Sequence, residues 1–191
     1  MHPVEVLAAL KECRRDEVVI TTMGVEREWL KMSQHPRDFF YVPSSMGQAP
    51  TFGLGLALAR PDLRVVVLNG DGCTLMNLGC LVTIAEQAPS NYSLIVFENG
   101  VYEVTGGQHL AGSGRVDFAV LARGAGFRNV SSVRDISSWK LAARRILHGP
   151  GLEFAVVRVE PVTAGELAPT APCPMPDQIA RFQKAIAAPV A

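Results

Sequence analysis

The chain is poor in cysteine, and its four cysteines do not cluster. Cys13, Cys73, Cys80 and Cys173 are scattered, and no two of them form a Cys-x-x-Cys pair. Zinc sites and iron–sulfur clusters usually depend on such closely spaced pairs. We therefore expect no cysteine-bound metal and predict that the four thiols are reduced.

Neither sign of charge is in excess, and no long apolar run occurs near the N-terminus. The 18 basic residues balance the 18 acidic residues. A nucleic-acid or membrane surface would need clustered Lys and Arg, so we expect no nucleic-acid or membrane partner. Glu5 comes early and no long apolar segment follows it, which argues against a secretory signal or a membrane span. We expect a cytoplasmic protein.

The remaining composition is that of a folded domain. Of the 191 residues, 48% are hydrophobic and 19% are charged, and no internal repeat or interdomain linker stands out. We therefore predict a single domain over residues 1–191.

Two apolar segments dominate the middle of the chain. Residues 64–68 lead into a Gly-Asp-Gly turn centred on Asp71, and residues 94–97 lead into Asn99. Segments that are apolar on both sides are typical of strands in a parallel sheet covered by helices. A helix between them completes a right-handed βαβ unit, which places Asp71 and Asn99 at the carboxyl ends of neighbouring strands. Open α/β sheets bind their ligands at this edge.

The residues at these strand ends indicate a phosphate and a cation as ligands. Gly70 and Gly72 allow the backbone to turn sharply and approach a ligand, and the amides from Cys73 onward begin a helix that attracts phosphate. Asp71 would repel a phosphate unless a cation lay between them. Mg²⁺ prefers oxygen ligands, so Asp71, the side-chain oxygen of Asn99 and diphosphate oxygens would suit its octahedron.

Each of these features has a simpler explanation on its own. Gly-Asp-Gly and Asn99-Gly100 are also common turns. Cys73 at a helix start is a candidate nucleophile, although we favour a small residue whose amide faces diphosphate. Only the conjunction of the two strand ends at this spacing indicates a ligand site.

The Gly-Asp-Gly turn, 26 intervening residues and Asn99 together resemble the diphosphate-binding motif of thiamine diphosphate (ThDP) enzymes. Ser44-Ser45-Met46-Gly47 is similar to a second segment of these enzymes. The resemblance implies that the Val101 carbonyl is the third metal ligand and that the Met46 side chain holds the cofactor in a bent form. It also implies that the Ser44 carbonyl and the Met46 amide bind the aminopyrimidine ring. The cofactor-binding residues implied in this way are Ser44, Ser45, Met46, Gly47, Gly70, Asp71, Gly72, Cys73, Asn99, Val101 and Tyr102, with Asp71, Asn99 and Val101 as the metal ligands.

The apolar periodicity of the whole chain predicts a three-layer α/β/α fold with a mainly parallel sheet of about six strands. We expect strands over residues 18–22, 39–42, 64–68, 94–97, 127–130 and 152–159. Helices are predicted over residues 4–15, 26–32, 51–59, 75–85, 116–126, 136–147 and 179–187. The helix over 51–59 consists of small and apolar residues, so we expect it to be buried. Residues 99–109 are predicted to form a long loop beside the site.

The resemblance narrows to one group of ThDP enzymes. Ser-Met-Gly, Gly-Asp-Gly-x-x-x-Met-Asn-x-Gly and Asn-Gly-x-Tyr-x-x-Thr-Gly-Gly-Gln are similar to decarboxylases of sulfopyruvate and phosphonopyruvate, in which the matching part is a β subunit or a C-terminal half. This resemblance implies a small 2-oxo acid as the substrate, loss of CO₂ and release of an aldehyde. Two residues depart from the pattern, because Glu98 stands where many relatives have Asn and Glu103 where they often have a small residue.

The resemblance also implies an incomplete active site. ThDP activation needs a glutamate at N1′ of the pyrimidine, which these enzymes take from a separate pyrimidine-binding domain. We therefore assign no catalytic residue to this chain and expect a pyrimidine-binding partner subunit in a hetero-oligomer. A carboligase half of the acetolactate-synthase type and a non-catalytic ThDP-binding module are the alternatives. The roles of Glu98, Glu103 and His109 stay open.

Overall fold

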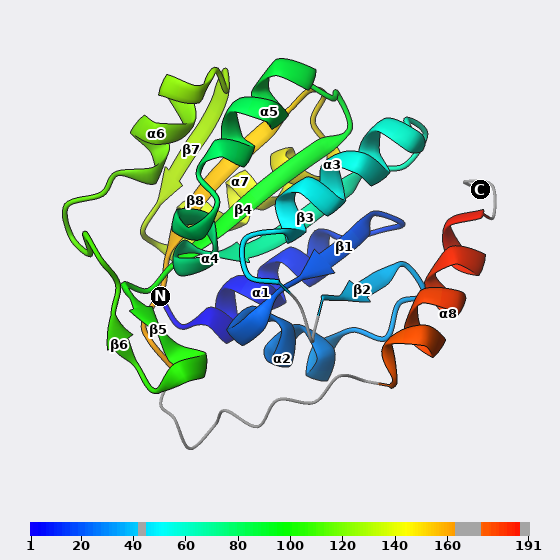
Figure 1. Ribbon diagram of the computed structural model, residues 1–191, viewed down its shortest axis with the longest axis horizontal. Coiled ribbons are helices and arrows are strands. Elements are labelled where there is room, and N and C mark those ends of the chain that lie inside the picture. The colour runs from blue at the N-terminus through cyan, green and yellow to red at the C-terminus, as the bar shows by residue number, and fades with distance from the viewer. Residues whose placement is uncertain (42–44, 163–172, 188–191) are drawn as a thin grey trace.

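The computed structural model describes residues 1–41, 45–162 and 173–187 (Figure 1). Its centre is a sheet of six strands in the order β2-β1-β3-β4-β8-β7. The strands are β1 (Val18–Thr21), β2 (Asp38–Phe40), β3 (Val65–Gly70), β4 (Tyr92–Glu98), β7 (Asn129–Val133) and β8 (Glu153–Arg158). Every pairing between neighbours in this sheet is parallel, as predicted.

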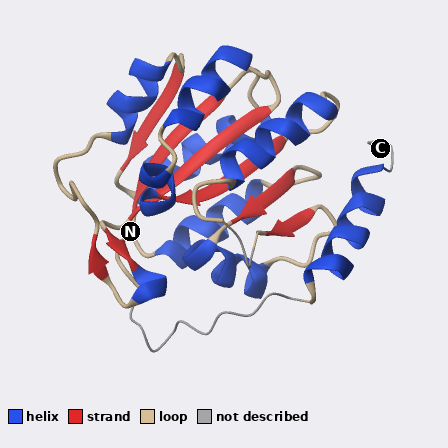
Figure 2. Ribbon diagram, viewed as in Figure 1, coloured by secondary structure: helices blue, strands red, loops and turns tan. Residues whose placement is uncertain are grey.

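Helices cover both faces of the sheet, so the predicted three-layer arrangement is confirmed (Figure 2). One face carries α1 (Pro3–Cys13), α2 (Met23–Met32) and α7 (Ile136–His148), and the other carries α3 (Ala49–Ala59), α4 (Asp71–Met76), α5 (Gly79–Gln87) and α6 (Phe118–Ala125). Helix α8 (Met175–Ala187) lies along the edge strand β2, where Gln178 Oε1 accepts a hydrogen bond of 2.6 Å from the Phe40 amide. Within the described ranges no helix is long and apolar enough to cross a membrane.

The central strands are apolar on both faces, which fixes the sheet inside the core. Val65 to Leu68 of β3 are all fully buried. Val65 and Val67 pack into the apolar cluster under α3 and α5, whereas Val66 and Leu68 pack into the cluster under α1 and α7. Successive side chains of a strand point to opposite faces, so a strand covered on both sides must be apolar throughout.

The site lies beside β1, the strand on whose two sides the following strands are added. Strand β2 lies on the outer side of β1, and β3 lies on its inner side. The segment after β1 continues into α2 on one face, and the segment after β3 continues into α4 on the other face. Diverging connections of this kind open a crevice at the carboxyl ends of the strands.

Two of the local predictions about helices were wrong. The predicted helix over 75–85 is split into α4 and α5, because the chain bends at Asn77, whose side-chain amide donates to the Gly47 carbonyl at 3.0 Å. Helix α3 is buried on one side only, since Phe52 and Leu58 are 37% and 49% exposed.

The predicted loop over 99–109 is also not a plain loop. It contains the antiparallel hairpin β5 (Val101–Tyr102) and β6 (Gln108–His109), joined through the short 3-10 helix η1 (Glu103–Thr105). This hairpin stands beside the carboxyl end of β4 (Figure 1). Val42 of the predicted strand over 39–42 lies outside the described residues.

We predict that two glycines of α3 respond in opposite ways to alanine. A Cβ atom on Gly53 would lie 2.5 Å from Val67 Cγ2, whereas a Cβ atom on Gly55 would meet nothing within 4 Å. Gly53→Ala should therefore lower the free energy of unfolding by about 1–2 kcal/mol through overpacking. Gly55→Ala, the matched control, should raise it by about 0.5–1 kcal/mol through helix propensity. Urea unfolding measures both, and equal effects would contradict the close packing of α3 on β3.

Candidate functional site

The carboxyl ends of β3 and β4 bring Asp71 and Asn99 together. The two strands pair in register up to Gly70 and Phe97, so the residues that follow leave the sheet side by side. Asp71 Oδ1 accepts a hydrogen bond from the Gly72 amide at 2.8 Å. Its Oδ2 atom accepts two more, from the Asn99 amide at 3.0 Å and the Gly100 amide at 2.7 Å. The Asp71 carboxylate therefore joins the two turns.

These contacts set the electrostatics of Asp71. The residue is 2% exposed, and burial raises the pKa of its carboxyl group, while the three amides oppose that rise. A carboxylate offers about four acceptor positions, so three amides leave one for a further donor or a cation. Asp71 is thus held in one orientation with a free acceptor position.

Asn99 is held by its own turn. Its Oδ1 atom accepts a hydrogen bond from the Val101 amide at 2.9 Å, and Gly100 between them has φ +77°. An amide oxygen has two lone pairs, so Oδ1 retains one of them for a ligand. Asn99 and Val101 line the same cavity as Asp71.

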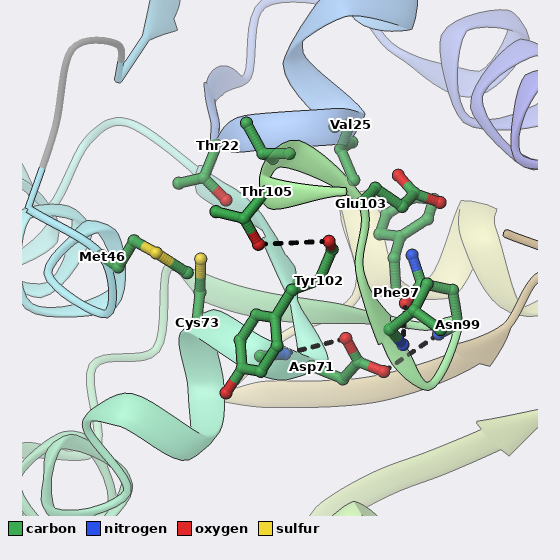
Figure 3. A pocket seen from close by; sticks show the side chains of 15 residues that line it. Thr22, Val25, Met46, Asp71, Cys73, Phe97, Asn99, Tyr102, Glu103 and Thr105 are labelled. Atoms are coloured by element: carbon green, nitrogen blue, oxygen red, sulfur yellow. Dashed lines mark hydrogen bonds between the residues drawn. The ribbon is translucent and has the colours of Figure 1, made fainter. Parts of the chain in front are cut away.

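This cavity lies between the β1–α2 turn, the start of α4 and the β5–β6 hairpin (Figure 3). Its lining residues are Thr22, Gly24, Val25, Met46, Gly70, Asp71, Gly72, Cys73, Phe97, Asn99, Val101, Tyr102, Glu103, Val104 and Thr105. Its volume is about 60 Å³, room for a few water molecules. The hairpin makes it narrow, because Tyr102 packs against Gly72, where a Cβ atom would lie 2.5 Å from the ring.

A chain of buried polar groups supports the floor of the cavity. Thr22 Oγ1 donates to Asn69 Oδ1 at 3.2 Å, and Asn69 Nδ2 donates to Thr74 Oγ1 at 2.9 Å. Thr74 Oγ1 donates in turn to the Gly70 carbonyl at 2.8 Å. These three side chains tie β1, β3 and α4 together. Sequence reasoning missed Asn69 and considered only the backbone amide of Thr74, since the one signal of these side chains was polarity next to an apolar strand.

The second predicted segment is only partly in the cavity. Met46 lies across from Cys73 (Figure 3), and Gly47 is buried against Asn77. Ser45 lines a separate apolar groove between α3 and α8, and Ser44 lies outside the described residues.

The surroundings of Cys73 bear on the two roles considered for it. Cys73 is buried, and that burial raises the pKa of its thiol. The thiol form is therefore favoured over the reactive thiolate. Its environment supports a packing role over a nucleophilic one.

The three residues whose roles were open lie in different places. Glu103 lines the cavity, whereas His109 is exposed on β6 and does not. Glu98 lines a neighbouring polar hollow of about 220 Å³ together with Asp71, Asn99 and Arg158, and burial raises the pKa of the Glu98 carboxyl. Glu103 lines the narrow cavity, and Glu98 approaches the same Asp71 and Asn99 from the neighbouring hollow.

The polar groups at this edge of the sheet suit a metal ion and a phosphate. Among the described residues no three His, Cys, Asp or Glu side chains gather as a metal site. A cation at Asp71 would therefore take its other ligands from the Asn99 amide oxygen, a backbone carbonyl and a bound anion, all of them oxygen donors that suit Mg²⁺. A Cβ atom on Gly70 would meet nothing within 4 Å, so this lining residue faces open space that an anion can fill. The residues present fit both groups.

A buried acid lies on the first turns of α2, next to the cavity. Glu26 is 1% exposed, its Oε1 atom has no hydrogen-bond partner, and burial raises the pKa of its carboxyl group to about 7. Its neighbour Arg27 is also buried and leaves Nε and Nη1 without partners. Sequence reasoning missed this pair, because no periodic signal marks a charged residue of α2 as buried.

The sequence matches one family model, described as "Thiamine pyrophosphate enzyme, C-terminal TPP binding domain", over residues 21–159. It is 39% identical over 152 residues to a phosphonopyruvate decarboxylase from Streptomyces viridochromogenes, and this match covers 78% of the chain and 38% of that protein. It is 37% identical over 165 residues to the β subunit of sulfopyruvate decarboxylase from Methanothermobacter thermautotrophicus, and this match covers 86% of the chain and 85% of that subunit. The chain thus spans under half of the first relative and most of the second.

A solved structure with a similar fold is benzoylformate decarboxylase from Polynucleobacter necessarius. The TM-score is 0.70 at 21% sequence identity, and the match covers 89% of this chain and 34% of that one. At this identity the likeness concerns the fold.

We predict that Glu26 makes stability depend on pH. Its pKa is about 7 in the folded chain and about 4.3 in an unfolded one, so folding favours its protonated form. The free energy of unfolding should therefore fall by about 3 kcal/mol as the pH rises from 4.5 to above 7. Glu26→Gln should remove this fall and be the more stable protein at pH 8. Glu28→Gln, on the same helix, should retain it, and identical pH profiles for the two variants in urea unfolding would disprove the assignment.

Proposed function

This chain belongs to the family of thiamine pyrophosphate enzymes, as their C-terminal TPP-binding domain, and we propose that it is the diphosphate-binding subunit of a ThDP- and Mg²⁺-dependent 2-oxo acid decarboxylase. Thiamine pyrophosphate and ThDP are the same compound. The observation that carries the proposal is the Asp71 carboxylate, fixed by three backbone amides beside Asn99 at the edge of a crevice.

The proposed ligands of Mg²⁺ are Asp71, the Oδ1 atom of Asn99 and the Val101 carbonyl, with diphosphate oxygens completing the octahedron. Gly70, Gly72 and the amide of Cys73 would face the diphosphate. The cavity of about 60 Å³ would hold only part of the cofactor, and the rest would lie against the partner subunit. Met46 would then support the bent cofactor, with Ser44, Ser45, Gly47 and Tyr102 around it.

The bound cofactor would supply the electron sink that lets a 2-oxo acid lose CO₂. The chain's own residues bind and orient it, and the apolar side chains of Val25, Phe97 and Val104 limit water at one end of the cavity. A dry wall protects a reactive intermediate from side reactions.

The chain would act together with a second subunit. The Methanothermobacter relative is named as a β subunit, and we propose that the partner supplies the glutamate that activates the cofactor. Neighbouring helices α3 and α5 support this, because they and the bend before α5 leave large apolar side chains uncovered: Phe52 and Leu58 on α3, Met76 and Leu78 around the bend, and Val82 on α5. Exposed large apolar side chains on neighbouring helices are typical of a protein interface. This surface also adjoins the Met46–Gly47 segment, so the partner that covers it would reach the cofactor.

We predict that Asp71→Ala abolishes Mg²⁺-dependent binding of ThDP. The change removes the one carboxylate that offers a ligand to the cation and frees the turn at Asn99. Equilibrium dialysis of the purified chain with ThDP, with and without Mg²⁺, should show at least hundredfold weaker binding. Asp177→Ala, which removes an exposed carboxylate on α8, is the control and should bind normally. Tight Mg²⁺-dependent binding to Asp71→Ala would sink the metal assignment.

We predict that Val82→Lys prevents assembly with the partner while the chain stays folded. Val82 is 58% exposed, so a lysine there places a charge in the proposed interface without disturbing the core. Leu141→Lys is the matched control, because Leu141 is 81% exposed on α7, on the opposite face of the sheet. Size-exclusion chromatography reports assembly, and thermal unfolding reports the fold.

The partner is to be identified by mass spectrometry after purification of the tagged chain from its native host in Mg²⁺ and ThDP. The two purified chains, mixed, should release CO₂ and an aldehyde from a 2-oxo acid. A product joined from two 2-oxo acids would instead indicate the carboligase alternative. A chain that stays alone would favour the non-catalytic binding module.

A further inference from the structure

We propose that the site takes 2-oxo acids with no second negative charge, and that Glu103 is the residue of this chain that discriminates against a sulfonate or phosphonate on carbon 3. The inference rests on the decarboxylase function proposed above and names the substrate class of that site. It departs from the names of the two decarboxylase relatives, since phosphonopyruvate and sulfopyruvate each carry an acidic group besides their carboxylate.

The described wall of the cavity carries acids and no base. Asp71 and Glu103 are its charged residues, and none of the other lining residues is Lys, Arg or His. A bound Mg²⁺ would neutralise the negative charge of Asp71. Glu103, by contrast, takes part in no salt bridge among the described residues. A second anion in this cavity would therefore meet a like charge and find no counter-charge among the described lining residues.

The Glu103 carboxylate is fixed where it stands. Its Oε1 atom accepts a hydrogen bond of 2.7 Å from the Val162 amide, which follows β8. Its other oxygen packs against Gly24 at the start of α2, where a Cβ atom would lie 2.5 Å away. These two contacts hold the Glu103 carboxylate between the segment after β8 and the start of α2.

The charge of Glu103 acts on Asp71, the proposed metal ligand. It is one of the causes that raise the pKa of Asp71, so the two carboxylates lie within electrostatic range. Glu103 and Met46 line the same small cavity from opposite sides (Figure 3). A substrate bound to a cofactor that Met46 supports would therefore lie between Met46 and the Glu103 side of the cavity.

Glu98 is a poorer candidate for the same role. It lines a neighbouring hollow with Asp71 and Asn99, and the positive charges of Arg158 and Arg134 act on it besides the negative charges of Asp71 and Asp117. Its charge is therefore partly offset, and it does not reach the cavity. Glu103 is the acid that remains uncompensated.

The test uses the assembled enzyme with Mg²⁺ and ThDP and compares two substrates of similar shape. Sulfopyruvate carries a sulfonate on carbon 3, and 4,4-dimethyl-2-oxopentanoate carries a tert-butyl group there. We expect the native enzyme to favour the neutral substrate at least tenfold in kcat/KM. Glu103→Gln keeps an acceptor for the Val162 amide and should raise kcat/KM for sulfopyruvate about tenfold, mainly through a lower KM, because it removes one unit of like charge. It should raise kcat/KM for the neutral substrate by a clearly smaller factor.

Glu12→Gln, an exposed acid on α1, is the control and should alter neither substrate. A native enzyme that prefers sulfopyruvate would overturn the inference, and so would a Glu103→Gln variant that changes both substrates by the same factor. If the assembled enzyme decarboxylated no 2-oxo acid, the proposed function itself would fail. An enzyme that decarboxylates 2-oxo acids but prefers sulfopyruvate would instead contradict only the inference about Glu103.

Discussion

The hydrogen bonds of the Asp71 carboxylate connect the parts on which the site depends. One oxygen binds the amide that follows it in the turn after β3, and the other binds two amides in the turn after β4. Burial makes an unpaired carboxylate costly, and these three donors offset that cost. They also fix the start of the β5–β6 hairpin, which carries Tyr102 and Glu103 over the cavity. One side chain thus positions both the floor and a wall of the site.

The sheet was predictable because its central strands leave no polar face. A run such as Val65 to Leu68 is compatible only with burial on both sides. Helix α3 shows the limit of that reasoning, since its apolar residues predicted burial and the fold covers one side only. Apolar composition does not tell whether a surface is covered by the same chain or by another. The break between α4 and α5 depended on a contact of Asn77 with Gly47, thirty positions away along the chain, which local propensity does not contain.

Some residues of the candidate site were likewise predictable from the sequence, and others were not. Asp71 and Asn99 follow directly from the ends of two consecutive strands, so their proximity needs only the βαβ rule. Thr22, Asn69 and Thr74 meet because β1 lies next to β3 in the sheet, and that strand order is a property of the whole fold. The burial of Glu26 depends likewise on how α2 packs. Glu103 was recognised as unusual in the sequence, but its position at the edge of the cavity depends on contacts with Gly24 and Val162.

The hydrogen bond between Asn77 and Gly47 connects the two binding events proposed for this chain, which are cofactor binding and assembly with the partner. Gly47 follows Met46, which lines the cavity, and Asn77 lies between Met76 and Leu78, which are 53% and 36% exposed. A partner that packs on those side chains would therefore restrain the segment that supports the cofactor. By thermodynamic linkage, a bound cofactor would strengthen assembly by the same factor by which assembly strengthens cofactor binding. In the proposed assembly, the exposed apolar side chains and the narrow cavity would both follow from a division of the site between two subunits.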